Sequence, residues 1–153
     1  MTTEVAGRNI VVAVDESEQS FYALQWAFDH IIRKDADKTI LVTVETPITS
    51  TAGAFAIPED NELSVEEDKE QETRSVAERA EAICKDNQVT SVTKVYQGEA
   101  REAICQACEE NEASMLVIGS HGHGPVKRSF LGSVSDYCSK YARCPVVVIR
   151  PIS

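Results

Sequence analysis

The stretch that decides the fold runs from Met115 to Val134 and reads MLVIGSHGHGPVKRSFLGSV. Its first four residues are apolar and indicate the end of a buried strand, and glycines follow at positions 119, 122 and 124. Gly132 comes directly before Ser133 and an amphipathic run that predicts a helix. Glycines let backbone N–H groups approach a ligand closely, and a helix start adds free N–H donors and the positive end of a dipole. The stretch therefore predicts an anion cradle, best suited to phosphate.

On both sides of this stretch, short apolar runs alternate with amphipathic ones. The expected strands are Asn9–Val14, Thr39–Val44, Ser91–Tyr96, Ser114–Ile118 and Val146–Arg150, and the expected helices run from the Asp15–Glu18 start to about Arg33, from Ser64 to Asn87, from Ala100 to Asn111 and from Ser133 to Tyr141. Such alternation predicts an α/β fold, a parallel sheet with helices on both faces and right-handed crossovers. The run SVTKVY alternates in polarity, which indicates a half-buried edge strand.

Length and composition predict one domain over residues 1–153, since the 153 residues are 42% hydrophobic and 26% charged. Residues 1–7 are expected to form a flexible leader. Residues 45–62 show no helical or strand periodicity and are rich in Pro, Thr, Ser, Gly and acidic residues, so we expect a mobile loop there.

The net charge of −10 argues against nucleic acid and anionic membrane surfaces as partners, because both would be repelled. Lys127, Arg128 and Arg143 still provide local positive charge near the glycine-rich stretch. No secretory signal and no apolar run of membrane-spanning length is evident in the sequence. A cytoplasmic location is expected, with the nucleus also compatible.

Five cysteines, an odd number, favour reduced thiols over a disulfide framework: Cys84, Cys105, Cys108, Cys138 and Cys144. Cys105 and Cys108 have the CxxC spacing of redox and metal sites but fall within a helical pattern, without a second CxxC. Packing on one helix face is therefore the favoured interpretation.

In parallel sheets ligands bind beyond the carboxyl ends of strands, where the strand order reverses. If the first and fourth strands are neighbours there, Asp15, Val44 and Gly119 converge. Asp15 is placed to accept hydrogen bonds from a ribose or to hold Mg²⁺ near phosphates. Its alternative role is to cap the helix that follows, and the two roles can coexist. Ser133 either contacts phosphate or caps the last helix.

Other residues of the glycine-rich stretch leave alternatives open. Gly119 and Gly122 are expected at tight turns, and a plain left-handed turn without ligand is the alternative. His121 and His123 carry only a weak metal signal, because no carboxylate lies near them in the sequence, and we expect no metal site there. The sequence contains no P-loop, no GxGxxG after the first strand and no GxSxG elbow. No nucleophile with an adjacent base is apparent, so no catalytic residue is assigned.

The spacing Gly119–x2–Gly122–x9–Gly132–Ser133 resembles the nucleotide motif of universal stress proteins. The resemblance extends to NIVVAVDESEQS near the start and to LGSVSDYCSKYARCPVVVIRP near the end, which are similar to plant members. It implies a three-layer αβα sandwich of the adenine nucleotide alpha hydrolase-like kind, with a five-stranded parallel sheet of order 3-2-1-4-5. It also implies that the chain binds ATP or AMP.

The resemblance implies a role for each residue at the strand ends. Asp15, flanked by Ala13 and Val14, would contact ribose, and Val44 the adenine. Ile118, Gly119 and Gly122 would line the ribose and phosphate turn, and Gly132, Ser133 and Val134 would hold the phosphates. Relatives often have Pro-Thr before the aspartate where this chain has Ala13–Val14, so the choice between ATP and AMP stays open.

Family members commonly dimerise through their last strands, and the apolar run Val146–Arg150 suits such pairing because an uncovered strand edge is a liability. A nucleotide-binding sensor or regulatory module of the stress response is the expected function. A slow ATP hydrolase using Asp15 and a redox-dependent, chaperone-like protein using its thiols are the alternatives.

Overall fold

The computed structural model describes residues 7–46, 60–120 and 132–151, with side chains of residues 60–66 left out. The strands are β1 (Asn9–Ala13), β2 (Lys38–Glu45), β3 (Ser91–Gln97), β4 (Met115–Gly119) and β5 (Val146–Ile149). The helices are α1 (Glu18–His30), α2 (Asp60–Asp86), α3 (Ala100–Glu110) and α4 (Ser133–Tyr141). Every strand and helix expected from the sequence is present.

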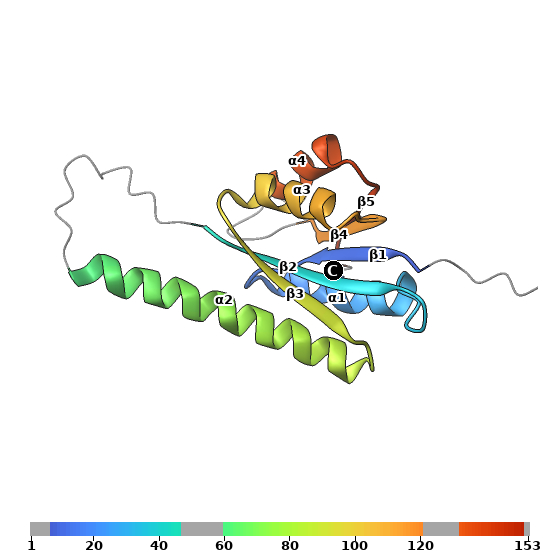
Figure 1. Cartoon of the computed structure of the whole chain (residues 1–153), viewed down its shortest axis with the longest axis horizontal. Coiled ribbons are helices and arrows are strands. Elements are labelled where there is room, and N and C mark those ends of the chain that lie inside the picture. Colours follow the sequence, from blue (N-terminus) through green and yellow to red (C-terminus); the bar gives the residue numbers. More distant parts are fainter. Residues whose placement is uncertain (1–6, 47–59, 121–131, 152–153) are drawn as a thin grey trace, which may run out of the picture.

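All strands pair in parallel in a five-stranded sheet of order β3-β2-β1-β4-β5. Helices α1 and α2 cover one face of this sheet, and α3 and α4 cover the other (Figure 1). The expected α/β class, three-layer sandwich and strand order are therefore confirmed. Residues 10–13 of β1 and 115–118 of β4 are apolar without alternation, because both faces of the sheet are covered.

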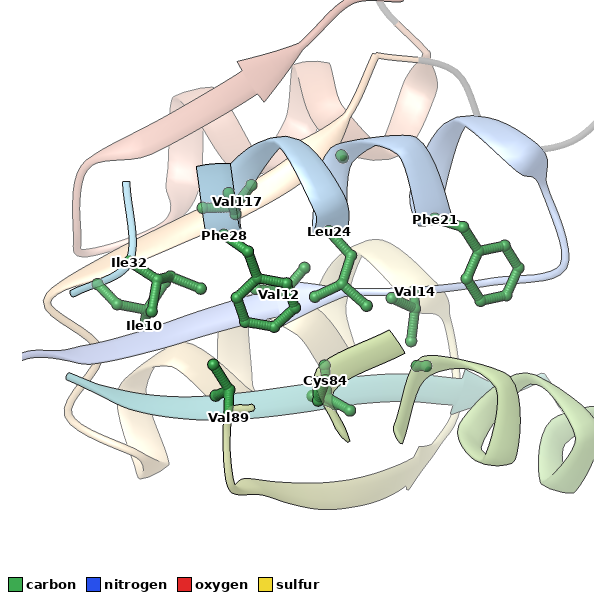
Figure 2. Close-up of a cluster of buried hydrophobic side chains, with 14 of the residues drawn as sticks. Ile10, Val12, Val14, Phe21, Leu24, Phe28, Ile32, Cys84, Val89 and Val117 are labelled. Atoms are coloured by element: carbon green, nitrogen blue, oxygen red, sulfur yellow. The ribbon is translucent and has the colours of Figure 1, made fainter. Parts of the chain in front are cut away.

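Two hydrophobic clusters fill the space between the sheet and its helices. In the cluster on the α1–α2 face, Phe21, Leu24 and Phe28 of α1 pack toward Val12 of β1 and Cys84 of α2 (Figure 2). In the opposite cluster, the residues of α3 and α4 are smaller: Ile104, Ala107, Cys108 and Cys138. Short side chains there allow these two helices to lie close to the sheet and to each other.

Some boundaries and side-chain positions differ from expectation. Helix α2 begins at Asp60 rather than Ser64, and β2 continues to Glu45, so the predicted loop 45–62 is shorter at both ends. The helical spacing of Val134, Cys138 and Tyr141 predicts one inward face, but Tyr141 is 63% exposed because α4 ends there. The segments 1–6 and 47–59, where a leader and a mobile loop are expected, lie outside the described residues.

The N-terminal half of α2 runs past the sheet on the side of the strands' carboxyl ends (Figure 1). The apolar residues of this helix come late, at Val76, Ala80 and Cys84, and the earlier residues Glu67, Asp68, Glu70 and Glu72 are exposed. No helix within the described ranges is both long and apolar enough to cross a membrane.

Candidate functional site

The strand order reverses between β1 and β4. Strand β1 pairs with β2 on one side and with β4 on the other, and Val12 is level with Val117 across the second pairing. The chain therefore leaves β1 and β4 in opposite directions along the sheet, which opens a crevice beyond their carboxyl ends. This is the convergence expected from the sequence.

Asp15 lies directly after β1, at the start of this crevice. Its Oδ1 accepts a hydrogen bond from the backbone N–H of Ser17 at 2.8 Å and another from the Ser17 hydroxyl. Ser17, not Asp15, is the N-cap of α1, and its Oγ accepts from the Ser20 N–H at 3.3 Å. The alternative of Asp15 as the helix cap is therefore wrong. Oδ2 of Asp15 accepts no hydrogen bond from any residue that the structure describes.

Ser20 holds the backbone of Asp15 in place. The Ser20 hydroxyl is buried, accepts the Asp15 N–H at 3.1 Å and donates to the Asp15 carbonyl at 2.9 Å. This residue was missed in the sequence, where a serine in the first turn of a helix is unremarkable. The bonds fix the direction in which the Asp15 carboxylate leaves the chain, which is what a ligand-binding side chain needs.

Gly119 ends β4 against the first turn of α1. A Cβ at this position would lie 3.1 Å from the Gln19 carbonyl oxygen and 3.5 Å from the Ser20 nitrogen. Close helix–strand packing is thus the reason for this glycine. The alternative of a plain left-handed turn at Gly119 is wrong, since Gly98 alone among the described glycines has a positive φ. Gly122 lies outside the described residues, so its expected role stays a prediction.

Ser120 connects β4 to both β5 and α4. Its N–H donates to the Ile149 carbonyl at 2.9 Å, and its own carbonyl accepts the Gly132 N–H at 2.6 Å and the Ser135 hydroxyl at 3.2 Å. These bonds place the start of α4 at the carboxyl end of β4. The Ser120 hydroxyl itself is buried and has no hydrogen-bond partner in the described part of the chain.

The N-terminus of α4 is open. Gly132 is its N-cap and has no side chain to accept a hydrogen bond, and Ser133 is exposed. No described residue accepts the N–H groups of Ser133 or Val134. Because these donors have no acceptor among the described residues and the helix dipole is positive there, the first turn of α4 can bind an anionic oxygen.

The apolar candidates divide between the two faces of the sheet. Ala13, Ile118, Val44 and Val134 belong to the cluster on the α3–α4 face, the last two half-buried. Val14 packs in the opposite cluster, so its backbone is the part that can reach a ligand beside α4. The structure thus brings Val44 and Val134 to the same side of the crevice.

Histidines 121 and 123 and the basic pair Lys127 and Arg128 lie outside the described residues. Elsewhere in the described ranges, no group of three or more His, Cys, Asp or Glu side chains is arranged to hold a metal ion.

The sequence matches the profile of the universal stress protein family over residues 7–150. It is 34% identical to universal stress protein PHOS34 from Arabidopsis thaliana over 97% of the chain, which spans 64% of that relative's length. A second Arabidopsis relative, universal stress protein PHOS32, is also 34% identical, and the chain spans 66% of its length. The chain belongs to the universal stress protein family, and its curated relatives include plant members.

Solved structures share the fold. Hypothetical protein MJ0577 superposes with a TM-score of 0.80 at 23% identity, covering 97% of this chain and 99% of its own. A universal stress protein family protein from Arabidopsis thaliana with AMP bound superposes with a TM-score of 0.69 at 23% identity. The match covers 95% of this chain and 93% of the Arabidopsis chain. Other structural neighbours are universal stress proteins in complex with cAMP, with a TM-score of 0.69 at 20% identity, and with dAMP, with 0.60 at 17%.

Proposed function

We propose that this chain binds an adenine nucleotide, ATP or AMP, in the crevice beyond β1 and β4. The family supports this, since members of the same fold hold AMP, cAMP or dAMP. The observation that carries the proposal is the open N-terminus of α4, where Gly132 leaves the N–H groups of Ser133 and Val134 without a described acceptor beside the end of β4. Such donors suit the α-phosphate that ATP and AMP have in common.

The donor set fits a nucleotide at both ends. Asp15 presents an oxygen free of described partners on a backbone fixed by Ser20, which suits two ribose hydroxyls or Mg²⁺ beside the phosphates. Val44 and Val134 offer apolar surface for the adenine side. The proposed site consists of Ala13, Val14, Asp15, Val44, Ile118, Gly119, Gly122, Gly132, Ser133 and Val134.

Calorimetric titration of the chain with ATP, ADP and AMP tests the proposal, with Asp15→Asn as the diagnostic variant. Asparagine keeps an oxygen for the Ser17 N–H but loses the charge, so α1 should remain intact. Because hydrogen bonds to a charged group contribute about 1.5–3 kcal/mol, we expect affinity to fall roughly 10- to 100-fold.

Asp35→Asn is the matched control, because Asp35 is exposed in the connection between α1 and β2, and it should bind like the wild type. Absence of binding by the wild type at millimolar nucleotide would falsify the proposal. Equal affinity of wild type and Asp15→Asn would exclude the ribose or Mg²⁺ role of Asp15.

We further propose that the bound nucleotide serves a sensor or regulatory role in the stress response, since no nucleophile with an adjacent base lies among the described site residues. Any ATP hydrolysis should be weak. Phosphate release above a buffer blank that disappears in Asp15→Asn, while binding persists, would instead support the hydrolase.

The remaining proposals concern the protein's partners and its location in the cell. A homodimer through Val146–Arg150 is proposed because β5 is an edge strand whose outer side pairs with no described residue. Cytoplasmic or nuclear location, and the lack of nucleic-acid and membrane partners, stay predictions from charge and composition.

A further inference from the structure

Four of the five cysteines gather where α3 packs on α4. Cys105 and Cys138 are in contact, with 3.8 Å between their Sγ atoms. Cys108 and Cys144 lie close enough for each thiol to influence the pKa of the other. Cys84, in contrast, packs in the cluster on the opposite face of the sheet. These thiols come from α3, from α4 and from the turn before β5, so they are brought together only by the fold.

We propose that Cys105 and Cys138 are an oxidative modification site, at which a peroxide forms a reversible disulfide between α3 and α4. The two sulfurs are already in contact at 3.8 Å, and a disulfide needs about 2.05 Å, so a small approach of the two side chains closes the bond. The inference does not depend on nucleotide binding.

The two thiols differ in exposure, which assigns them different roles. Cys105 is half-buried and within reach of a small oxidant, whereas Cys138 is fully buried. The Cys138 thiol also points to the Arg101 carbonyl of α3, with 3.9 Å between sulfur and oxygen. Cys105 is therefore the thiol that meets the peroxide, and Cys138 is the resolving thiol.

The reaction balances in two steps. The Cys105 sulfur attacks the peroxide, an S–O bond forms as the O–O bond breaks, and the leaving oxygen departs as water or an alcohol with the thiol proton. Cys138 then attacks the Cys105 sulfur, the S–S bond forms, and the sulfenic oxygen leaves as water with the Cys138 proton. Two thiols are oxidised and one peroxide is reduced, and a dithiol reductant reverses the change.

Burial raises the pKa of Cys105 and of Cys138, so both thiols carry their protons at neutral pH. The guanidinium of Arg101, whose carbonyl faces the Cys138 thiol, lies over the Tyr137 ring with 5.2 Å to its centroid, and its Nε is 3.9 Å from a Glu99 carboxylate oxygen. Because the thiolate is the reactive form, the site should respond to sustained oxidation rather than to traces of peroxide.

Peptide mass spectrometry on the native full chain tests the inference, after hydrogen peroxide treatment and alkylation of the remaining thiols. Trypsin places Cys105 and Cys108 in the peptide 102–127, Cys138 in 129–140 and Cys144 in a third peptide. We expect a cross-link between the first two peptides, lower in mass by two hydrogen atoms. Fragmentation between Cys105 and Cys108 should assign it to Cys105, and dithiothreitol should remove it.

Two variants and a control complete the test. Cys105→Ser and Cys138→Ser should each abolish the cross-link, while Cys84→Ser should retain it. The wild-type spectrum gives a result even if a variant folds poorly. A cross-link from Cys108 instead, disulfides only between two chains, or sulfinic acid at Cys105 without any cross-link would each overturn the proposal.

Discussion

Asp37 is the most strongly held charged residue in the described part of the chain. Its side chain is fully buried, and it accepts hydrogen bonds from Arg8 Nη2 at 2.6 Å and from the Arg33 backbone N–H at 2.8 Å. Removing the carboxylate takes away the acceptor that these two donors share, so we expect Asp37→Ala to lower the free energy of unfolding by about 2 kcal/mol. Urea denaturation measures the loss, and the exposed Asp35→Ala should show almost none.

The same contacts predict how stability depends on pH. Burial opposes ionisation of Asp37, but hydrogen bonds from Arg8 and Arg33 outweigh it and hold the pKa of this carboxyl well below its usual range. A depressed folded-state pKa contributes stability that is complete above the unfolded value of about 3.9 and is lost as pH falls below it. The stability difference between wild type and Asp37→Ala should therefore shrink below about pH 4. A constant difference down to pH 2 would contradict the assignment.

Gly119 permits the close approach of β4 and α1. A methyl group there would lie 3.1 Å from the Gln19 carbonyl oxygen, which belongs to helical backbone and cannot turn aside. We expect Gly119→Ala to destabilise the fold by about 1–3 kcal/mol, as overpacked core positions do. Thermal denaturation measures this loss. An unchanged melting temperature would mean that α1 shifts without cost.

At the scale of elements, β5 offers a sharp test of the proposed dimer. The carbonyls of Pro145 and Ile149 bond to β4, so in a regular strand the polar backbone groups of Val148 point to the free edge. Val148→Pro removes an outward N–H, and we expect it to give a monomer with nearly the wild-type stability. Light scattering after gel filtration measures the mass.

Val147→Pro is the matched control for this edge. It removes an N–H on the side of β4 and should destabilise the fold itself. A Val148→Pro protein that stays dimeric would place the dimer contact elsewhere.

The elements were predictable because each has a local signal. Continuous apolar runs predict β1 and β4, alternation predicts β3, and the helical spacing of Phe21, Leu24 and Phe28 predicts α1. The boundaries that were missed are polar ones. Residues 60–62 include no apolar residue that would mark them as helical. Asp15 and Ser17 are both common N-cap residue types, so the sequence does not distinguish them, and only the geometry identifies Ser17 as the cap.

For the molecule as a whole, ligand binding should appear as added stability. A ligand that binds only the folded chain, at a concentration of about 100 times its Kd, adds about 2.7 kcal/mol. For a domain of this size we therefore expect AMP or ATP to raise the melting temperature by about 5–10 °C. Asp15→Asn at the same concentration should show a smaller rise. No rise with either nucleotide in the wild type would count against the site.

The proposed site could be predicted only in part, because its residues come from distant parts of the chain. The position of Asp15, Val44 and Gly132 at strand and helix ends follows from the parallel topology. Other contacts depend on tertiary packing, and no periodicity in the sequence predicts them. They are the hydrogen bonds of Ser20 to Asp15, the contact between Gly119 and Gln19, and the contact between Cys105 and Cys138. Arg8 and Asp37 are likewise far apart in the chain and adjacent only in the fold.

The backbone of Ser120 bonds to three residues: its N–H donates to Ile149, and its carbonyl accepts from Gly132 and Ser135. These bonds hold the first turn of α4 against the ends of β4 and β5. Substitutions in the sequence between Ser120 and Gly132 should therefore leave the position of this helix on the sheet unchanged.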